Sequence, residues 1–215
     1  MKYMAVIFDL DGTLTDSLAD LADATNHALV KFGLPEKSLT QYKKMIGNGL
    51  RIMISRAMED VNPEILDDVI AEMKRKYRQI CLNKTKLYKG IQETIAQLKD
   101  QRVKLAVLTN KDQDMAKKII THFFTEDVFD KIVGTTGSEP PKPGTAAVKA
   151  IAESFGLAND QFLFVGDSSV DMDTAVAAGI TAVGVSWGFR DVTELTAHGA
   201  DKIIYQPNEI LAFFN

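Results

Sequence analysis

The stretch MAVIFDLDGT, residues 4–13, decides how this chain folds. An uninterrupted apolar run, Met4–Phe8, ends at two aspartates, Asp9 and Asp11, with Gly12 directly after them. Apolar residues without alternation are typical of a parallel strand that is covered on both faces. We therefore expect a central strand that ends in a loop bearing two carboxylates.

Further short apolar runs, each followed by turn or polar residues, predict the other strands of the sheet. Helical patterns lie between them; Ile91, Ile95 and Leu98, for example, share one helical face. Alternation of strands and helices is typical of an α/β fold, here a doubly wound, mainly parallel, Rossmann-like sheet. The further predicted strands are Val103–Thr109, Lys131–Val133, Phe162–Val165, Thr181–Ser186 and Lys202–Tyr205.

The interval between residues 16 and 84 has a different pattern, with amphipathic helical stripes and no convincing strand. A helix that connects two parallel strands needs far fewer residues. We therefore expect an α/β core formed by residues 1–15 and 85–215, with an α-helical cap, residues 16–84, inserted after the first strand. Ser17 and Asp20 are three residues apart at the start of the first stripe, a spacing that predicts a helix cap.

The composition of the 215 residues argues against several classes of protein. With 25 Lys and Arg against 29 Asp and Glu, the net charge is −4, which disfavours affinity for the nucleic-acid backbone. No apolar run approaches the ~18–20 residues of a membrane span, and the N-terminal run is too short for a signal peptide. Cys81 is the single cysteine, so no disulfide can form within the chain. We expect a cytoplasmic protein without a nucleic-acid or membrane partner, and no pattern predicts its oligomeric state.

Polar residues stand near the predicted ends of several strands. Ligands of open α/β sheets bind at the carboxyl ends of the strands, near the point where the strand order reverses. We therefore expect four polar groups to meet in one pocket. These groups are Asp9–Thr13 after the first strand, Thr109–Lys111 after the second, Lys142 in a loop before a helix, and Gly166–Asp171 after the fourth.

The charges of these groups indicate a metal ion and a phosphorylated ligand. Asp9 and Asp11, with Asp167 as a third carboxylate, repel one another unless a cation offsets them. Mg²⁺ prefers such hard oxygen ligands and often keeps phosphate oxygens in its shell. Lys142 adds a positive charge, and Thr109–Asn110 adds a hydroxyl and an amide, all of them able to contact phosphoryl oxygens.

Together these groups resemble the motifs of the haloacid dehalogenase-like hydrolase superfamily, most of whose members transfer phosphoryl groups through an aspartate nucleophile. The groups occur in the family's order, and the helical insert stands where the cap-1 class carries its cap, so the resemblance covers essentially the whole chain. Two further stretches, Gly47–Leu50 and Gly184–Gly188, are similar to the phosphoglycolate phosphatase branch. Lys89 and Gly144 stand where the family often has proline, beside the chemistry rather than in it.

The resemblance implies a Mg²⁺-dependent phosphatase that hydrolyses a small phosphorylated metabolite, similar to phosphoglycolate, through an aspartyl-phosphate. Asp9 looks like the nucleophile, and Asp11 looks like the acid that protonates the leaving oxygen and then the base that activates water. The implied phosphate-binding residues are Thr109, Asn110 and Lys142. The implied Mg²⁺ ligands are Asp9, the backbone carbonyl of Asp11, and Asp167, with Asp171 acting through water or by orienting Lys142.

The cap contributes candidate substrate contacts at Gly47–Arg51, because its two glycines allow a close approach to the pocket. The candidates are Asn48 and Arg51, and Arg51 is able to pair with a carboxylate such as that of phosphoglycolate. An ordinary solvated helix position is the alternative for Arg51. We interpret the basic run Lys74–Lys76, followed by Arg78, as the solvated face of a helix.

Other functions use the same residues or a competing motif. A phosphomutase similar to β-phosphoglucomutase, or a pyrophosphatase, shares the core motifs, whereas a dehalogenase does not need the proton donor Asp11. An inactive family member that only binds a phosphorylated ligand does not need both carboxylates of the first motif. Gly184–Gly188 also fits the Gly-x-Ser-x-Gly motif of serine hydrolases around Ser186, but the possible partners Asp191 and His198 follow too closely along the chain.

Overall fold

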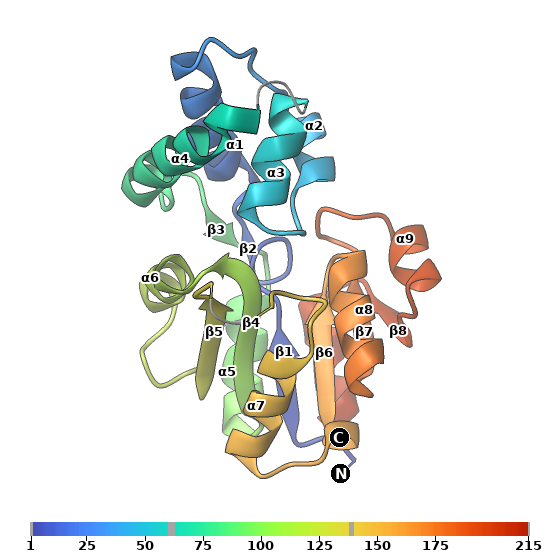
Figure 1. Ribbon diagram of the computed structural model, residues 1–215. Helices are drawn as coiled ribbons and strands as arrows, with labels where there is room; N and C mark the ends of the chain where they lie inside the picture. The colour runs from blue at the N-terminus through green and yellow to red at the C-terminus, as the bar shows by residue number, and fades with distance from the viewer. Residues whose placement is uncertain (1, 60–62, 138–139, 215) are drawn as a thin grey trace.

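A parallel sheet forms the larger part of the molecule, as the computed structural model shows for residues 2–59, 63–137 and 140–214 (Figure 1). Within these residues the sheet has six strands in the order β5–β4–β1–β6–β7–β8, and each neighbouring pair is parallel. The predicted doubly wound α/β fold is confirmed. The strands are β1 (Ala5–Phe8), β4 (Lys104–Asp112), β5 (Lys131–Thr135), β6 (Phe162–Gly166), β7 (Thr181–Val185) and β8 (Lys202–Ile204).

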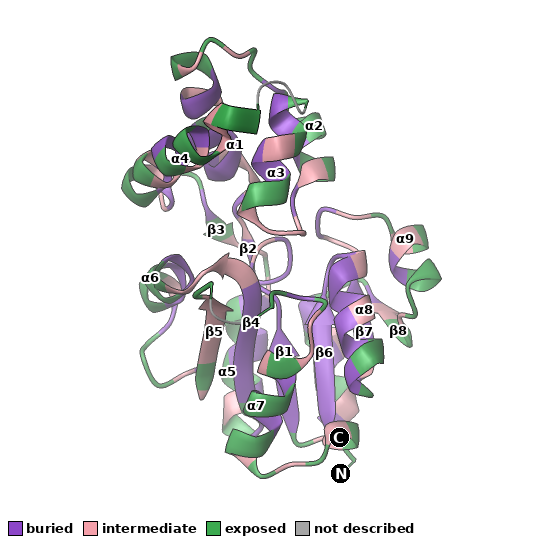
Figure 2. Ribbon diagram, viewed as in Figure 1, coloured by how far each residue is buried: buried purple, intermediate pink, exposed green. Residues whose placement is uncertain are grey.

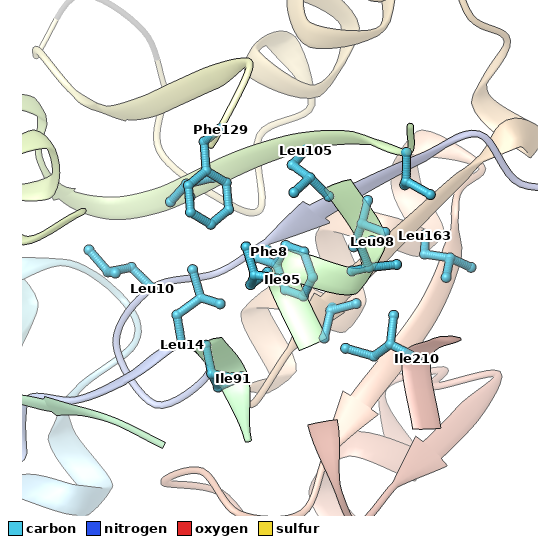
Figure 3. Close-up of a cluster of buried hydrophobic side chains, with 14 of the residues drawn as sticks. Phe8, Leu10, Leu14, Ile91, Ile95, Leu98, Leu105, Phe129, Leu163 and Ile210 are labelled. Carbon is cyan, nitrogen blue, oxygen red and sulfur yellow. The ribbon is translucent and has the colours of Figure 1, made fainter. Parts of the chain in front are cut away.

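Helices cover both faces of the sheet, and the side chains of β1 alternate between them. Val6 and Phe8 pack in one apolar cluster with α5 (Ile91–Asp100) and α6 (Gln113–Phe123), part of which Figure 3 shows. Ala5 and Ile7 pack on the other face, against the helices that follow β5 and β6. All four side chains are fully buried, which explains why this strand has no polar position (Figure 2). The remaining core elements are α7 (Ala146–Phe155), η2 (Asn159–Gln161), α8 (Ser169–Ala178), α9 (Val192–Ala197) and η3 (Pro207–Phe214).

The segment between β1 and α5 is helical, and its helices lie over the carboxyl ends of the strands (Figure 1). They have an apolar core of their own, in which Tyr42, Ile54 and Met73 are almost completely buried. We call this helical segment the cap. None of the helices in the described ranges is long and apolar enough to cross a membrane. The cap elements are α1 (Leu18–Lys31), α2 (Leu39–Met45), α3 (Leu50–Met58), η1 (Pro63–Ile65) and α4 (Leu66–Ile80).

A two-stranded antiparallel ribbon joins the cap to the core and was not predicted. It pairs β2 (Thr15–Asp16) with β3 (Lys86–Leu87), where the chain leaves the core and where it returns. The buried carboxylate of Asp20 accepts hydrogen bonds from the backbone N–H groups of Lys84 and Thr85, 2.8–3.1 Å away, and so ties the two linkers together. The predicted cap of α1 by Ser17 and Asp20 is therefore wrong, because both side chains are engaged elsewhere.

Candidate active site

The site lies at the carboxyl ends of β1, β4 and β6, where the strand order reverses. β1 stands between β4 and β6, and the chain proceeds from these two strands toward opposite edges of the sheet. Such a reversal leaves a crevice at the strand ends. The structure places residues from three of the four predicted polar groups on the wall of one cavity between this crevice and the cap, and the fourth group, Gly166–Asp171, is not part of that wall. The lining residues are Asp9, Asp11, Thr109, Asn110, Lys111 and Lys142.

Three buried carboxylates form a cluster beneath the cavity. Oxygens of Asp9, Asp167 and Asp171 lie within 4.8 Å of one another. The approach of Asp167 to the first loop depends on two glycines. A Cβ at Gly12 would lie 2.2 Å from Oδ2 of Asp167, and a Cβ at Gly188 would lie 2.2 Å from its Cβ. No larger residue fits at either position without moving this carboxylate.

Lys142 is held between two of these carboxylates. Its Nζ lies 2.8 Å from Oδ1 of Asp9 and 2.6 Å from Oδ1 of Asp171. The other oxygen of Asp171 accepts hydrogen bonds from the backbone N–H and the hydroxyl of Ser168, at 3.0 and 2.7 Å. Asp171 thus caps α8 and at the same time fixes the Lys142 ammonium beside Asp9.

The cluster carries more negative than positive charge. Burial raises the pKa of Asp9 to about 7; Asp171 and Asp11 raise it as well, while the Lys142 ammonium opposes them. Burial, Asp171 and Asp9 together raise the pKa of Asp167 well above its usual range, against one backbone N–H and one hydroxyl that donate to it. Three carboxylates and one ammonium leave two negative charges, so this donor set fits a divalent cation such as Mg²⁺.

The side chain of Asp11 lies apart from that cluster. Its Oδ1 accepts a 2.5 Å hydrogen bond from the hydroxyl of Ser17, and its Oδ2 lies 2.7 Å from Nζ of Lys111, a nearly buried ammonium. Its carboxylate therefore points toward the cap rather than toward Asp167. Lys111 was part of the predicted polar group after the second strand, but its pairing with Asp11 depends on the tertiary structure and was missed.

Asn110 connects three segments around the site. Its Oδ1 accepts a hydrogen bond from the backbone N–H of Lys142 at 2.8 Å, and its Nδ2 donates to the carbonyls of Lys142 and Gly47 at 3.1 and 3.2 Å. The amide thus holds the Lys142 loop against the cap. Thr109 lies next to it in β4, which extends to Asp112 rather than ending at Thr109 as predicted.

Two predicted cap contacts do not line the cavity. Oδ1 of Asn48 accepts a hydrogen bond from the guanidinium of Arg56 at 3.0 Å, and Arg51 is exposed and pairs with Asp67 at 2.5 Å. The cause is the direction of α3, which begins at Leu50. Leu50 and Met53, three residues apart, face the cavity, and Arg51 therefore points to the outside.

The cap helix α4 supplies polar residues that the sequence interpretation placed on a solvated face. Lys74, Tyr77 and Arg78 all line the cavity, at the spacing that brings side chains to one side of a helix. Nζ of Lys74 lies 2.9 Å from Oδ2 of Asp112 in the core. The interpretation as a solvated face is therefore wrong for Lys74, which pairs with the core, whereas Arg78 is exposed and also borders the cavity. The i, i+3, i+4 spacing was the available signal for both. We call the cap side of the cavity the roof. Its remaining lining is apolar and consists of Leu21, Ile46, Leu50, Met53 and Met73, with Met115 of the core helix α6 beside them.

The competing serine motif has another role in the structure. The candidate triad partners are engaged elsewhere: Asp191 accepts a hydrogen bond from the N–H of Thr193 as the cap of α9, and Nδ1 of His198 lies 2.9 Å from Asp173. The residue after the motif, Phe189, donates its N–H to Asp167 at 2.8 Å. This segment supports the carboxylate cluster rather than forming a triad.

Comparisons with known proteins agree with the geometry. A model of the haloacid dehalogenase-like hydrolase family matches residues 6–185. A phosphoglycolate phosphatase from Mannheimia succiniciproducens is 36% identical over 197 residues, which are 88% of this chain and 88% of that protein. One from Haemophilus influenzae is 32% identical over 211 residues, 94% of both. The crystal structure of a predicted phosphoglycolate phosphatase from Haemophilus somnus covers 100% of this chain and 99% of its own, with a TM-score of 0.94 at 30% identity.

Proposed function

We propose that this chain hydrolyses a small phosphorylated metabolite through an aspartyl-phosphate at Asp9, with Mg²⁺ bound beside it. The chain belongs to the haloacid dehalogenase-like hydrolase family and is a phosphoric monoester hydrolase. The expected resemblance to the phosphoglycolate phosphatase branch is confirmed. The observation that carries the proposal is the position of Asp9: its Oδ1 contacts Lys142, and its carboxylate borders the cavity. A carboxylate beside a cation at a switch point is suited to attack phosphorus.

In the first half of the proposed reaction an oxygen of Asp9 forms a bond to phosphorus while the bond from phosphorus to the leaving oxygen breaks. Protonated Asp11 gives its proton to that oxygen, so the product leaves as an alcohol. The Lys142 ammonium offsets the charge of the phosphoryl oxygens, and the Thr109 hydroxyl donates a hydrogen bond that orients them. Bound Mg²⁺ would be held by Asp9 and Asp167, with the carbonyl of Asp11, and would offset their negative charge.

In the second half water attacks the phosphorus and gives a proton to Asp11, and the bond between phosphorus and Asp9 breaks. Inorganic phosphate leaves, and both aspartates return to their first state. Lys111 and Ser17 keep the Asp11 carboxylate directed at the cavity through both halves. The apolar roof limits the access of other water, because the cap covers the strand ends.

The cavity and the relatives together support a small substrate. Asp9 is only 7% exposed beneath the cap, a position that a phosphate on the surface of a macromolecule reaches poorly. The relatives from Mannheimia succiniciproducens and Haemophilus influenzae are named phosphoglycolate phosphatases, so we propose phosphoglycolate or a metabolite of similar size. A cytoplasmic location remains a prediction from the sequence.

The test is a panel of phosphorylated metabolites with Mg²⁺, ranked by kcat/KM. We expect hydrolysis of phosphoglycolate or a similarly small monoester, loss of activity on adding EDTA, and recovery with excess Mg²⁺. Asp9→Asn serves as the inactive control. Turnover that survives EDTA, or that survives in the Asn variant, contradicts the proposal.

A further inference from the structure

Two polar groups of α4 reach the cavity without a partner in the described part of the chain. Tyr77 is only 4% exposed, and its buried hydroxyl has no hydrogen-bond partner among the described residues. The Lys111 ammonium lies 4.8 Å from the centre of the Tyr77 ring and contacts its face. A buried hydroxyl without a partner is costly, so its retention indicates a partner that is absent from the free protein.

Arg78, the next residue, also lines the cavity and is exposed at its edge, and among the described residues its side chain has neither an ion pair nor a hydrogen bond. The other cations at this site are engaged: Lys74 with Asp112, Lys111 with Asp11, and Lys142 with Asp9. Of the cations that line the cavity in the described ranges, Arg78 is therefore the one whose charge is still available to a ligand.

The backbone at this turn of the helix is fixed to the core. Nζ of Lys118, in α6, donates a 2.7 Å hydrogen bond to the carbonyl of Arg78. The ion pair between Lys74 and Asp112 holds the preceding turn. The two available groups thus stand on a helix segment anchored across the cavity, so little backbone ordering is needed when they bind a ligand.

We propose that Arg78 and Tyr77 form the receptor for an anionic group on the leaving part of the substrate, so that the enzyme selects phosphomonoesters that carry a second anion, above all a carboxylate. The phosphoryl group occupies the Asp9 and Lys142 side of the cavity, and the second anion faces α4. This inference rests on the proposed function. It assigns to Arg78 the carboxylate contact that the sequence had suggested for Arg51, which lies outside the cavity.

The chemistry of both groups favours a carboxylate. A guanidinium offers a planar pair of donors that matches the two oxygens of a carboxylate, and a phenol supplies one further donor. Asp11 and Asp112 also line the cavity, but each is paired with a lysine, Lys111 and Lys74 respectively, so their charges are offset when an anion binds beside α4. A neutral leaving group leaves the hydroxyl and the guanidinium unsatisfied.

The experiment compares phosphoglycolate with ethylene glycol monophosphate, in which a hydroxymethyl group replaces the carboxylate. For Arg78→Ala we expect kcat/KM for phosphoglycolate to fall about 10- to 100-fold, the value of a charge-assisted contact, mainly through KM. The value for ethylene glycol monophosphate should change less than about threefold. Arg78→Lys, which keeps the charge without the paired donors, should restore part of the loss.

Tyr77→Phe gives a second and independent measurement. The change removes an unpartnered buried oxygen, so we expect an unchanged or higher melting temperature together with a loss of about 3- to 10-fold in kcat/KM for phosphoglycolate. Lys76→Ala is the matched control, since it removes a positive charge from the same helix at a position that does not line the cavity. It should leave both substrates unaffected.

The outcomes separate this inference from the proposed function. If the wild-type protein hydrolyses neither substrate, nor a generic aryl phosphate, the proposed function fails. If it hydrolyses both and Arg78→Ala lowers the two values equally, or lowers neither, the anion receptor is refuted and the phosphatase stands. A selective loss in Lys76→Ala would also refute it, because the effect would then come from general charge.

Discussion

The floor and the roof of the cavity are built in opposite ways. On the floor, charged side chains contact one another: Asp9 with Lys142, Asp171 with Lys142, and Asp11 with Lys111. The roof is formed by aliphatic and methionine side chains of the cap. At its edge lie the Arg78 guanidinium and the Tyr77 hydroxyl, neither of which has a partner among the residues that the structure describes. The side chains of the floor are thus held in position before a ligand binds, whereas the roof still has polar groups that are able to bind a ligand.

This difference divides the work of the enzyme. Charges that are already oriented stabilise a reacting phosphoryl group without further reorganisation. A surface of flexible apolar side chains excludes water and adapts to the shape of the leaving group. Changes to the floor should therefore affect all substrates, and changes to the roof should affect one substrate more than another.

The largest effect is expected for Asp9→Asn. The amide keeps the size of the side chain but cannot attack phosphorus as a carboxylate does, so kcat should fall by roughly 10⁴-fold or more for every substrate. Initial rates on a carboxylate-bearing and a neutral phosphomonoester measure this, with circular dichroism to show that the fold is kept. A loss confined to one substrate would contradict the claim that residues of the floor act on every substrate alike.

A loss of about 10²- to 10³-fold is expected for Lys142→Met, again for all substrates, because the phosphoryl group loses its ammonium contact. The change also leaves Asp9 and Asp171 facing each other without a cation, so without Mg²⁺ the free energy of unfolding should fall by about 3 kcal/mol. Urea titration measures the second effect. Lys149→Met, at an exposed position of α7, is the control, and an equal effect there would contradict the account.

Lys111→Met tests how the floor positions Asp11. Without the 2.7 Å ion pair the carboxylate loses one of its two fixed contacts, so kcat should fall about 10- to 100-fold while KM changes little. Lys111→Arg, which retains the charge, should recover part of kcat. An increase in KM with kcat unchanged would instead assign Lys111 to substrate binding.

A smaller effect is expected at the contact between core and cap. The guanidinium of Arg190 donates hydrogen bonds of 2.6–2.9 Å to the carbonyls of Lys43, Lys44 and Ile46, at the end of α2. Arg190→Ala should loosen the cap and raise KM about 3- to 10-fold, with a smaller change in kcat. Steady-state kinetics measure both values. A fall in kcat as large as that of Lys142→Met would show that the roof takes part in the chemistry.

The smallest effect concerns the stability of the cap at low pH. Hydrogen bonds from Arg75 and Lys31 hold the pKa of Glu72 well below its usual value of 4.5, so the ionised form stabilises the fold. This contribution is complete above pH 4.5 and is lost as the pH falls below that value. Glu72→Gln should therefore lower the melting temperature at neutral pH, and the gap to the wild type should close in acid. A gap that does not depend on pH would contradict this assignment.

The sequence predicted the parts of the molecule that depend on local pattern. Consecutive apolar residues such as Met4–Phe8 predict a buried parallel strand, and the polar residues at its end follow from the direction of the chain. The pairing of β2 with β3 was missed because strands of two residues carry no periodicity. Ser17 and Asp20 have the spacing of a helix cap, but the Ser17 hydroxyl donates to Asp11 instead. The Asp20 carboxylate accepts from the N–H of Thr85 in the linker.

The least predictable feature of the site was which side of each cap helix is turned toward the core. Arg51 and Arg78 both stand on helices with polar and apolar sides, and the choice of the side that meets the core depends on how the whole cap docks. That docking is set by contacts far apart in the sequence, such as those of Arg190 and Lys118. No local pattern carries this information.

Mass spectrometry of the protein quenched in acid during turnover would detect the proposed aspartyl-phosphate itself. We expect the peptide containing Asp9 to gain the mass of one phosphoryl group, fragmentation to locate this group on Asp9, and the modification to disappear when substrate is exhausted. A phosphoryl group on Asp11, Ser186 or any other side chain, or turnover without a modified peptide, would refute Asp9 as the nucleophile.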